Sequence, residues 1–360
     1  MISILVFVVM FGILIVVHEF GHFIVAKKQG VRVEKFALGF GPALLKKKEG
    51  DTEYSICAVP LGGYVKLAGD NLEEYKGKNY EYLSKTPFAR AKIVFFGPLL
   101  NYLLGFFCFC LVFFAGYPTL TTKVGGLLDG YGAKESGIVA GDKIISVDGK
   151  TLNSWDDLQM AIYDKEPGAQ VKIDYLRANN LLHANVILKK KEVDDQLGKK
   201  RNVGLLGITP DFSQTIKIRH NFFQSVALGA EKTWMITVIT YKAIWRLASG
   251  SLSLRDSVTG PIGIFVITAK AAHTGLASIL NLIGLLSVSL AIFNLLPLPA
   301  LDGGHILLLF IEKIRGRYLS IKVEKVITQA GFMFLIFLVV IVTYNDILRF
   351  FGDKITKLVK

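Results

Sequence analysis

The sequence predicts a polytopic α-helical membrane protein with four transmembrane helices, a cytoplasmic membrane-associated β-hairpin region and one α+β domain outside the membrane. Three observations support this fold class. The chain of 360 residues is 52% hydrophobic with a mean hydropathy of +0.45, which is too apolar for an ordinary soluble protein. Long apolar runs recur along it. Lysine and arginine gather beside these runs, as the positive-inside rule requires of cytoplasmic loops.

The charge and the cysteines exclude other classes. A formal net charge of +13 can indicate nucleic-acid binding, but here the basic residues cluster beside apolar spans. We therefore expect a lipid bilayer as partner and no nucleic acid. The three cysteines are Cys57, Cys108 and Cys110, and their placement suggests neither a disulfide scaffold nor a thiolate metal site. The N-terminus lacks a basic region and a small-residue cleavage site, which predicts a retained helix.

The basic loops orient the spans. Lys27, Lys28 and Arg32 follow the first span, so its end is expected in the cytoplasm and both termini of the protein outside. The predicted organisation is a first transmembrane helix (1–27), a cytoplasmic β-hairpin region (28–92), a second transmembrane helix (93–117), the outer domain (118–212), an amphipathic membrane-surface region (213–273), a third transmembrane helix (274–303), a cytoplasmic loop (304–325), a fourth transmembrane helix (326–351) and a tail (352–360).

The polar region after the first span carries strand signals. Two short strands, Glu53–Val59 and Gly63–Leu67, are predicted on either side of a turn at 60–63. Such a hairpin can simply pack on the membrane face, which is the commoner case. It can also offer a strand edge to an extended peptide.

Strand and turn signals continue in the outer domain. A helix is predicted over Trp155–Tyr163, and strands over Val171–Leu176 and His183–Leu188. After this domain, 222–248 reads as an amphipathic helix on the outer membrane surface. The competing interpretation, a fifth span, would invert the third span. The next segment, Gly260–Gly263, is predicted as a turn.

Two spans contain polar or helix-breaking residues. In the second, Pro98 frees backbone groups, and Asn101 places an amide at membrane depth, where helix packing is its more common role. The third span should break near Pro297 and Pro299, which would turn Asn294 and Asp302 inward. Asn101, Pro98, Pro297 and Pro299 are therefore expected to be supporting residues of a site.

The first span contains the clearest chemical motif. His18-Glu19-Phe20-Gly21-His22 reads H-E-x-x-H, and on a helix the two imidazoles share one face and can share a metal ion. Asp302, at matching depth near the cytoplasmic end of the third span, is the candidate third ligand. Glu19 is the candidate general base of a zinc-dependent hydrolase. Gly21, without a side chain, leaves room for close approach of backbone or substrate.

Alternatives to a catalytic site remain open at this point. A structural zinc would need a fourth protein ligand, and His305 is the spare residue nearby. Intramembrane carboxylates also occur in proton or ion paths of transporters, although no inverted repeat is visible. The alternative function is a membrane scaffold with a structural zinc and no protease activity.

The joint motif set resembles the site-2 protease family of intramembrane zinc metalloproteases, in particular the bacterial regulator-of-sigma-E protease branch. The matching motifs are H-E-F-G-H, F-A-L-G-F-G-P, P-L-G-G-Y-V-K-L-A-G, G-P-L-L-N, T-G-P-I-G-I and N-L-L-P-L-P-A-L-D-G-G-H. The outer domain resembles a PDZ domain through S-G-I-V-A-G-D-K-I-I-S-V-D-G-K. Many proteobacterial relatives carry two such modules, whereas this chain carries one.

The resemblance implies roles for particular residues. It implies His18, His22 and Asp302 as ligands of Zn²⁺ and Glu19 as the catalytic base. Substrate contacts are implied for Asn294, which would touch the substrate backbone, and for the hairpin, which would guide the substrate as an added strand. The hairpin residues concerned are Gly39, Phe40, Gly41 and Tyr64.

The resemblance also implies a setting. The protein would cut single-span membrane proteins, such as anti-sigma factors or signal-peptide remnants, after an upstream extracytoplasmic protease has made the first cut. It would do so in the bacterial cytoplasmic (inner) membrane, with the PDZ-like domain outside as a size filter and the active site toward the cytoplasm.

Overall fold

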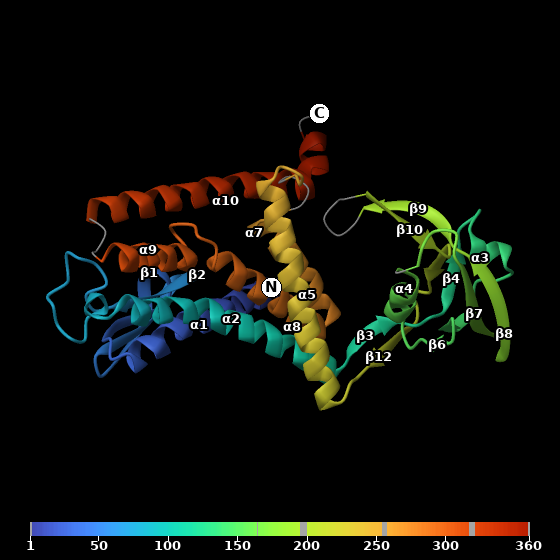
Figure 1. Cartoon of the computed structure of the whole chain (residues 1–360), viewed down its shortest axis with the longest axis horizontal. Coiled ribbons are helices and arrows are strands. Elements are labelled where there is room, and N and C mark those ends of the chain that lie inside the picture. The colour runs from blue at the N-terminus through green and yellow to red at the C-terminus, as the bar shows by residue number, and fades with distance from the viewer. Residues whose placement is uncertain (1, 164, 195–199, 254–257, 317–320, 359–360) are drawn as a thin grey trace. The chain divides into compact units, whose positions relative to one another are not determined.

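A computed structural model describes residues 2–163, 165–194, 200–253, 258–316 and 321–358 (Figure 1). The chain forms two compact units. Unit 1 comprises Met1–Val112 and Phe222–Lys360, and unit 2 comprises Phe113–Asn221. Unit 1 contains all the residues predicted to form the metal centre.

Unit 1 is built around long apolar helices. Four helices within the described residues are long and apolar enough to cross a membrane: α1 (Ile2–Lys28), α2 (Pro87–Ala115), α8 (Leu276–Asn294) and the segment Lys325–Phe351 of α10 (Ile321–Leu358). Only 11% of the apolar window is buried in α1, and the same holds for α10. Apolar helices with such exposed faces suit a lipid environment, in agreement with the predicted four spans.

The third predicted span breaks where its prolines predict. α8 ends at Asn294, residues 295–301 turn, and α9 (Asp302–Arg315) begins at Asp302. Gly303 allows this turn to close, because a Cβ there would overlap the carbonyl oxygens of Leu295 and Leu296. The predicted loop 304–325 is wrong in part, since α9 continues to Arg315. Lys313 and Arg315, basic residues that favour a cytoplasmic loop, form the last turn of this helix. Residues 317–320 of that loop lie outside the described part of the chain.

The predicted strand pairing of the hairpin region is also wrong. The hairpin consists of β1 (Val33–Glu49) and β2 (Thr52–Leu67), with its turn at Gly50 and Asp51. The segments predicted as two strands both belong to β2. They do not pair with each other, because both pair with the same stretch of β1: Phe36 lies opposite both Tyr54 and Val65. The glycines and proline that suggested a turn lie where β2 passes from one side of β1 to the other, and positive φ angles occur at Gly39, Gly41 and Gly62.

The predicted membrane-surface region, 213–273, contains two helices among its described residues. α5 (Phe222–Ala248) has the predicted bounds, and its aromatic side chains Phe222, Phe223, Trp234 and Trp245 are exposed. Its buried face consists mainly of small residues, Ser225, Gly229, Thr233 and Thr237, and Gly229 packs directly on Cys110 of α2.

The second helix was missed by the sequence analysis. The predicted turn at 260–263 is the start of α7 (Pro261–Thr274), whose N-cap is Gly260. Asp346 of α10 accepts hydrogen bonds from the amides of Gly260 and Gly263, so the glycines serve helix capping.

Unit 2 is a small α+β structure. Its four-stranded antiparallel sheet has the order β6 (Lys150–Thr151), β5 (Lys143–Val147), β7 (Gln170–Arg177), β8 (Asn180–Ile187). Three further pairs are β4 (Val124–Leu127) with β11 (Ile208–Pro210), β3 (Tyr117–Leu120) with β12 (Thr215–Ile218), and β9 (Lys189–Asp194) with β10 (Lys200–Leu205). The predicted helix is α4 (Trp155–Tyr163), and the two predicted strands are β7 (Gln170–Arg177) and β8 (Asn180–Ile187). The core is made by Ile144, Val147, Trp155, Leu158, Val171, Ile173 and Val186. A short helix, α3 (Gly132–Glu135), completes the described elements of unit 2.

Candidate metal centre

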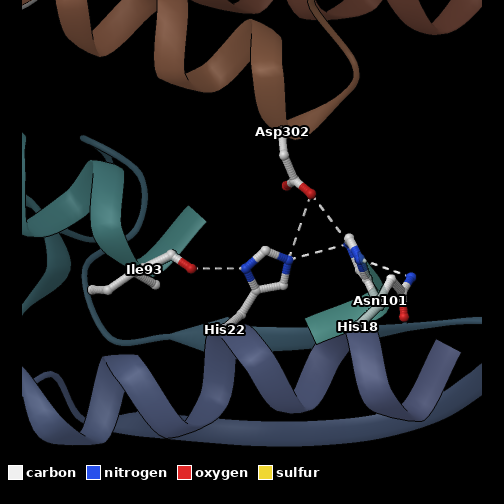
Figure 2. Close-up of polar contacts among 5 residues, drawn as sticks. All are labelled: His18, His22, Ile93, Asn101 and Asp302. Atoms are coloured by element: carbon white, nitrogen blue, oxygen red, sulfur yellow. Dashed lines mark hydrogen bonds and ion pairs between the residues drawn. The ribbon is translucent and has the colours of Figure 1, made fainter. Parts of the chain in front are cut away.

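Two histidines of α1 form the base of the site. Because α1 is helical through residues 18–22, His18 and His22 project from the same face, and their Nε2 atoms lie 3.2 Å apart. Figure 2 shows both imidazoles pointing toward the start of α9.

Asp302 completes the group from a distant part of the sequence. The break between α8 and α9 places Asp302 at the first position of α9, and its carboxylate points at the two imidazoles (Figure 2). Its Oδ2 atom lies 3.1 Å from His18 Nε2 and 3.7 Å from His22 Nε2. The predicted ligand trio is therefore brought together by the fold.

The three donor atoms fit a zinc ion. Zinc bound tetrahedrally at about 2.0–2.1 Å separates its ligands by about 3.3 Å, and the observed separations of 3.1, 3.2 and 3.7 Å bracket that value. Within the described residues, this is the one group of three histidine, cysteine or carboxylate side chains whose ligand atoms converge within 4.8 Å. Two imidazoles and one carboxylate are the donor set of many catalytic zinc sites, which keep a fourth position open.

The second helix orients the histidines. The Nδ1 atom of His22 lies 2.9 Å from the carbonyl oxygen of Ile93, which can only accept a hydrogen bond. His22 therefore carries its proton on Nδ1, and its Nε2 lone pair faces the site. The Asn101 amide lies 3.4 Å from Nδ1 of His18. The supporting residue Pro98 lies inside α2, between these two contacts.

A cavity of about 420 Å³ adjoins the metal centre. Glu19, His22 and Asp302 line one part of it, and Arg90 and Glu312 line another. Glu19 therefore borders a space next to the ligands, as a general base must. His305 lines the same cavity but is not one of the converging donors, so the described geometry leaves no fourth protein ligand.

The hairpin passes directly beside Glu19. A Cβ built on Gly63 of β2 would lie 2.9 Å from Cγ2 of Ile15 and 3.1 Å from Cγ of Glu19. Tyr64 follows Gly63 directly, and its ring stacks on that of Phe40 with centroids 6.2 Å apart.

The other residues predicted to contact substrate lie in β1 and at the end of α8. Gly39 and Gly41 lie in β1 with positive φ, and Asn294 is the last residue of α8. Pro297 and Pro299 lie in the break before α9.

Several residues at the site escaped sequence reasoning. The Ile93 carbonyl is a backbone group, so no residue type in the sequence indicates its contact with His22. The buried ion pair between Arg90 of α2 and Glu312 of α9 joins residues that were counted only as loop charges. Gly97 could have been found from its motif: a Cβ there would overlap the His22 imidazole, so only glycine fits.

Comparison with known proteins identifies a family. The family description "Peptidase family M50" matches residues 6–338. A predicted zinc metalloprotease of Clostridium acetobutylicum is 33% identical over 96% of this chain and 97% of its own. The regulator of sigma-W protease RasP of Bacillus subtilis is 28% identical, covering 97% and 99%, and the protease RseP of Yersinia pestis is 29% identical, covering 96% and 98%.

Among solved structures, part of this chain is similar to a PDZ domain. The PDZ domain of an SdrC-like protein from Listeria monocytogenes is 26% identical, covering 26% of this chain and 88% of that one, with a TM-score of 0.20.

The site and the relatives together define a zinc metalloendopeptidase with several apolar helices able to span a membrane. The chain belongs to peptidase family M50, the site-2 protease family.

Proposed function

We propose that this protein is an intramembrane endopeptidase in which His18, His22 and Asp302 hold the zinc ion and Glu19 is the general base. The observation that carries the proposal is the convergence of the three donor atoms from α1 and α9, which are almost three hundred residues apart in sequence. Asn294, at the end of α8, is proposed to contact the substrate backbone near the scissile bond.

The residues divide the chemistry between them. Bound zinc supplies Lewis acidity, which polarises a peptide carbonyl and makes water a stronger acid at neutral pH. The Glu19 carboxylate accepts the proton of the attacking water and delivers it to the leaving amine. Asp302 also balances part of the metal's charge inside an apolar helix bundle, where an unpaired charge would be costly.

The substrate class follows from the setting of the site. The two histidines lie on α1, which is apolar enough to span the bilayer, and Asp302 follows the break after α8, another such helix. We therefore propose that the enzyme cuts single-span membrane proteins within or near their transmembrane segment. A spanning helix hides its peptide bonds in internal hydrogen bonds, so the substrate must unwind locally before attack. The bulged hairpin, which passes beside Glu19, is proposed to receive the unwound segment as an added strand.

The sidedness of the protein is part of the proposal. The basic residues at the ends of α1 and α9 favour a cytoplasmic position for the hairpin and for the end of α1 that carries the histidines. Unit 2 would then lie outside a bacterial cytoplasmic membrane as a PDZ-like size filter. Such a filter would admit substrates already trimmed by a first protease, such as anti-sigma factors or signal-peptide remnants.

One experiment separates this function from a membrane scaffold with a structural zinc. Full-length protein in detergent is mixed with a labelled single-span substrate, with and without a chelator. We expect cleavage that the chelator stops while the protein stays folded, and that added zinc restores. Unfolding on chelation, with no cleavage before it, would favour the scaffold.

The substrate offers a second test of the same proposal. Replacing helix-destabilising residues of its transmembrane segment with leucine or alanine should slow cleavage, because local unwinding becomes costlier. An unchanged cleavage rate would argue against attack on an unwound transmembrane segment.

A further inference from the structure

We infer that Asn101 is a positioning residue that holds the His18 imidazole in the tautomer needed for metal binding through Nε2. This inference rests on the proposed function, because it assigns Asn101 a role toward the same metal centre. It also gives a specific task to a residue whose sequence context suggested ordinary helix packing.

The requirement comes from imidazole chemistry. A neutral imidazole carries one proton, and a ring that binds a metal through Nε2 must keep that proton on Nδ1. The Nδ1–H group then needs a hydrogen-bond acceptor. For His22 the acceptor is the Ile93 carbonyl at 2.9 Å, so the structure already fixes that ring. The equivalent acceptor for His18 has to come from another group.

Asn101 is the group in position to supply it. Its side chain is fully buried, and its amide lies 3.4 Å from Nδ1 of His18 (Figure 2). Ile93 and Asn101 lie eight residues apart on α2, about two turns, so one face of this helix reaches both histidines. The Ile93 carbonyl and the Asn101 amide, both of α2, therefore each contact the Nδ1 atom of one of the two histidines.

The orientation of the amide decides what it does. As placed, Nδ2 faces His18, while Oδ1 is buried with no hydrogen-bond partner in the described part of the chain. An amide N–H donated to Nδ1 would force the imidazole proton onto Nε2 and block the metal. Rotating the amide by 180° puts Oδ1 opposite Nδ1, where it accepts the imidazole proton. Oxygen and nitrogen of an amide occupy nearly equal volumes, so this rotation needs no repacking.

Helix packing is handled by other atoms of the same residue. The Ser287 hydroxyl of α8 donates a hydrogen bond of 2.7 Å to the backbone carbonyl of Asn101. This bond joins α2 to α8 without using the side chain. The Asn101 amide is therefore left for His18, which is its one side-chain partner among the described residues.

The test measures metal affinity in the full-length protein in detergent. The protein is stripped with a chelator and titrated with Zn²⁺ in competition with a chromophoric chelator, and with Co²⁺ followed by absorption. Asn101→Leu keeps the branched shape of the side chain and removes the acceptor. Asn101→Asp keeps an acceptor oxygen. Ser287→Ala is the matched control, because it removes the neighbouring α2–α8 hydrogen bond and leaves the amide in place.

We expect Asn101→Leu to weaken Zn²⁺ binding by about 10- to 100-fold and to change the Co²⁺ absorption, as is usual when the outer partner of a ligating histidine is lost. Asn101→Asp should restore most of the affinity, and Ser287→Ala should bind like the wild type. If the leucine variant does not fold, Asn101→Ala tests the same loss with a smaller side chain.

Two results would overturn the inference, and they are distinguishable. If the wild type binds Zn²⁺ and cleaves substrate while a folded Asn101→Leu or Asn101→Ala variant binds Zn²⁺ equally well, the role of Asn101 alone is wrong. If Ser287→Ala weakens binding as much as the Asn101 variants, the effect is packing and not the tautomer. A wild type that binds no Zn²⁺ would remove the proposed function and this inference together.

Discussion

Gly21 of α1 packs against the backbone of Gly97 in α2: a Cβ at Gly21 would lie 2.8 Å from the Gly97 Cα atom. The reverse constraint also holds, because a Cβ at Gly97 would overlap the His22 ring. α1 and α2 can approach this closely only where both lack side chains. This close approach lets the Ile93 carbonyl reach His22, and it agrees with the room expected at Gly21 from the sequence.

Gly21→Ala should therefore destabilise the protein by about 1–3 kcal/mol, the usual cost of overpacking, and should weaken zinc binding. The matched control is Gly12→Ala in the same helix, because a Cβ at Gly12 meets nothing within 4 Å. Thermal unfolding in detergent should show a lower midpoint for Gly21→Ala alone. Equal midpoints for the two variants would mean that α1 and α2 do not cross as described.

Asp302→Asn should lower the zinc affinity, because an amide is a weaker ligand than a carboxylate and does not balance the metal's charge. The loss should exceed the roughly 10- to 100-fold loss that follows removal of a hydrogen-bond partner of a metal-binding side chain. Metal content after dialysis against a chelator measures it. The matched control is His305→Asn, which alters the same cavity outside the converging trio. Retained zinc in Asp302→Asn, or lost zinc in His305→Asn, would change the ligand set.

Arg90→Met should cost about 3–5 kcal/mol, because it leaves Glu312 as an uncompensated charge in a largely buried site. The side chains of Arg90 and Glu312 are only 3% and 13% exposed. Lys47→Met is the control, since Lys47 and Glu49 form a pair that is 80% and 73% exposed.

The double variant Arg90→Met with Glu312→Leu should recover most of the free energy of unfolding that Arg90→Met alone loses. A double variant as unstable as Arg90→Met alone would show that the ion pair is not what joins α2 to α9.

The free energy of unfolding of unit 2 should decrease at acidic pH, because Asp142 becomes protonated there. Burial alone would raise the pKa of Asp142, but hydrogen bonds from Arg177 and from the Val139 amide hold that pKa below its ordinary value. A depressed folded-state pKa means stabilisation that is complete above about pH 4, the pKa of an unfolded aspartate, and is lost as the pH falls through the folded value.

Hydrogen exchange of the β5 and β7 amides in the full-length protein, corrected for intrinsic rates, measures this loss. Asp142→Asn is the matched control and should show weaker protection at neutral pH with a smaller acid dependence. Identical acid profiles for wild type and variant would assign the effect to other groups.

The sequence predicted the four apolar spans, the break near Pro297 and Pro299, and α4, because each depends on local composition or periodicity. The convergence of His18, His22 and Asp302 was also predictable. The H-E-x-x-H spacing places two histidines on one helix face, and the basic loops placed Asp302 at a matching depth.

The remaining features depend on long-range contacts. The glycines of β2 suggested a turn between two paired strands. They lie instead where β2 passes from one side of β1 to the other, and Gly63 among them closely approaches Glu19. The Ile93 carbonyl and the Arg90–Glu312 pair require knowing how α2 packs against α1 and α9. No local pattern encodes that packing.

The most direct measurement is cleavage of a labelled single-span substrate by Glu19→Gln in the full-length protein, with its zinc content determined in parallel. Glutamine keeps the shape of the side chain and cannot accept the water proton, so activity should fall by at least about 10²–10⁴-fold while one zinc per chain is retained. A Glu19→Gln protein that cleaves at the wild-type rate would contradict Glu19 as the base of an intramembrane zinc protease.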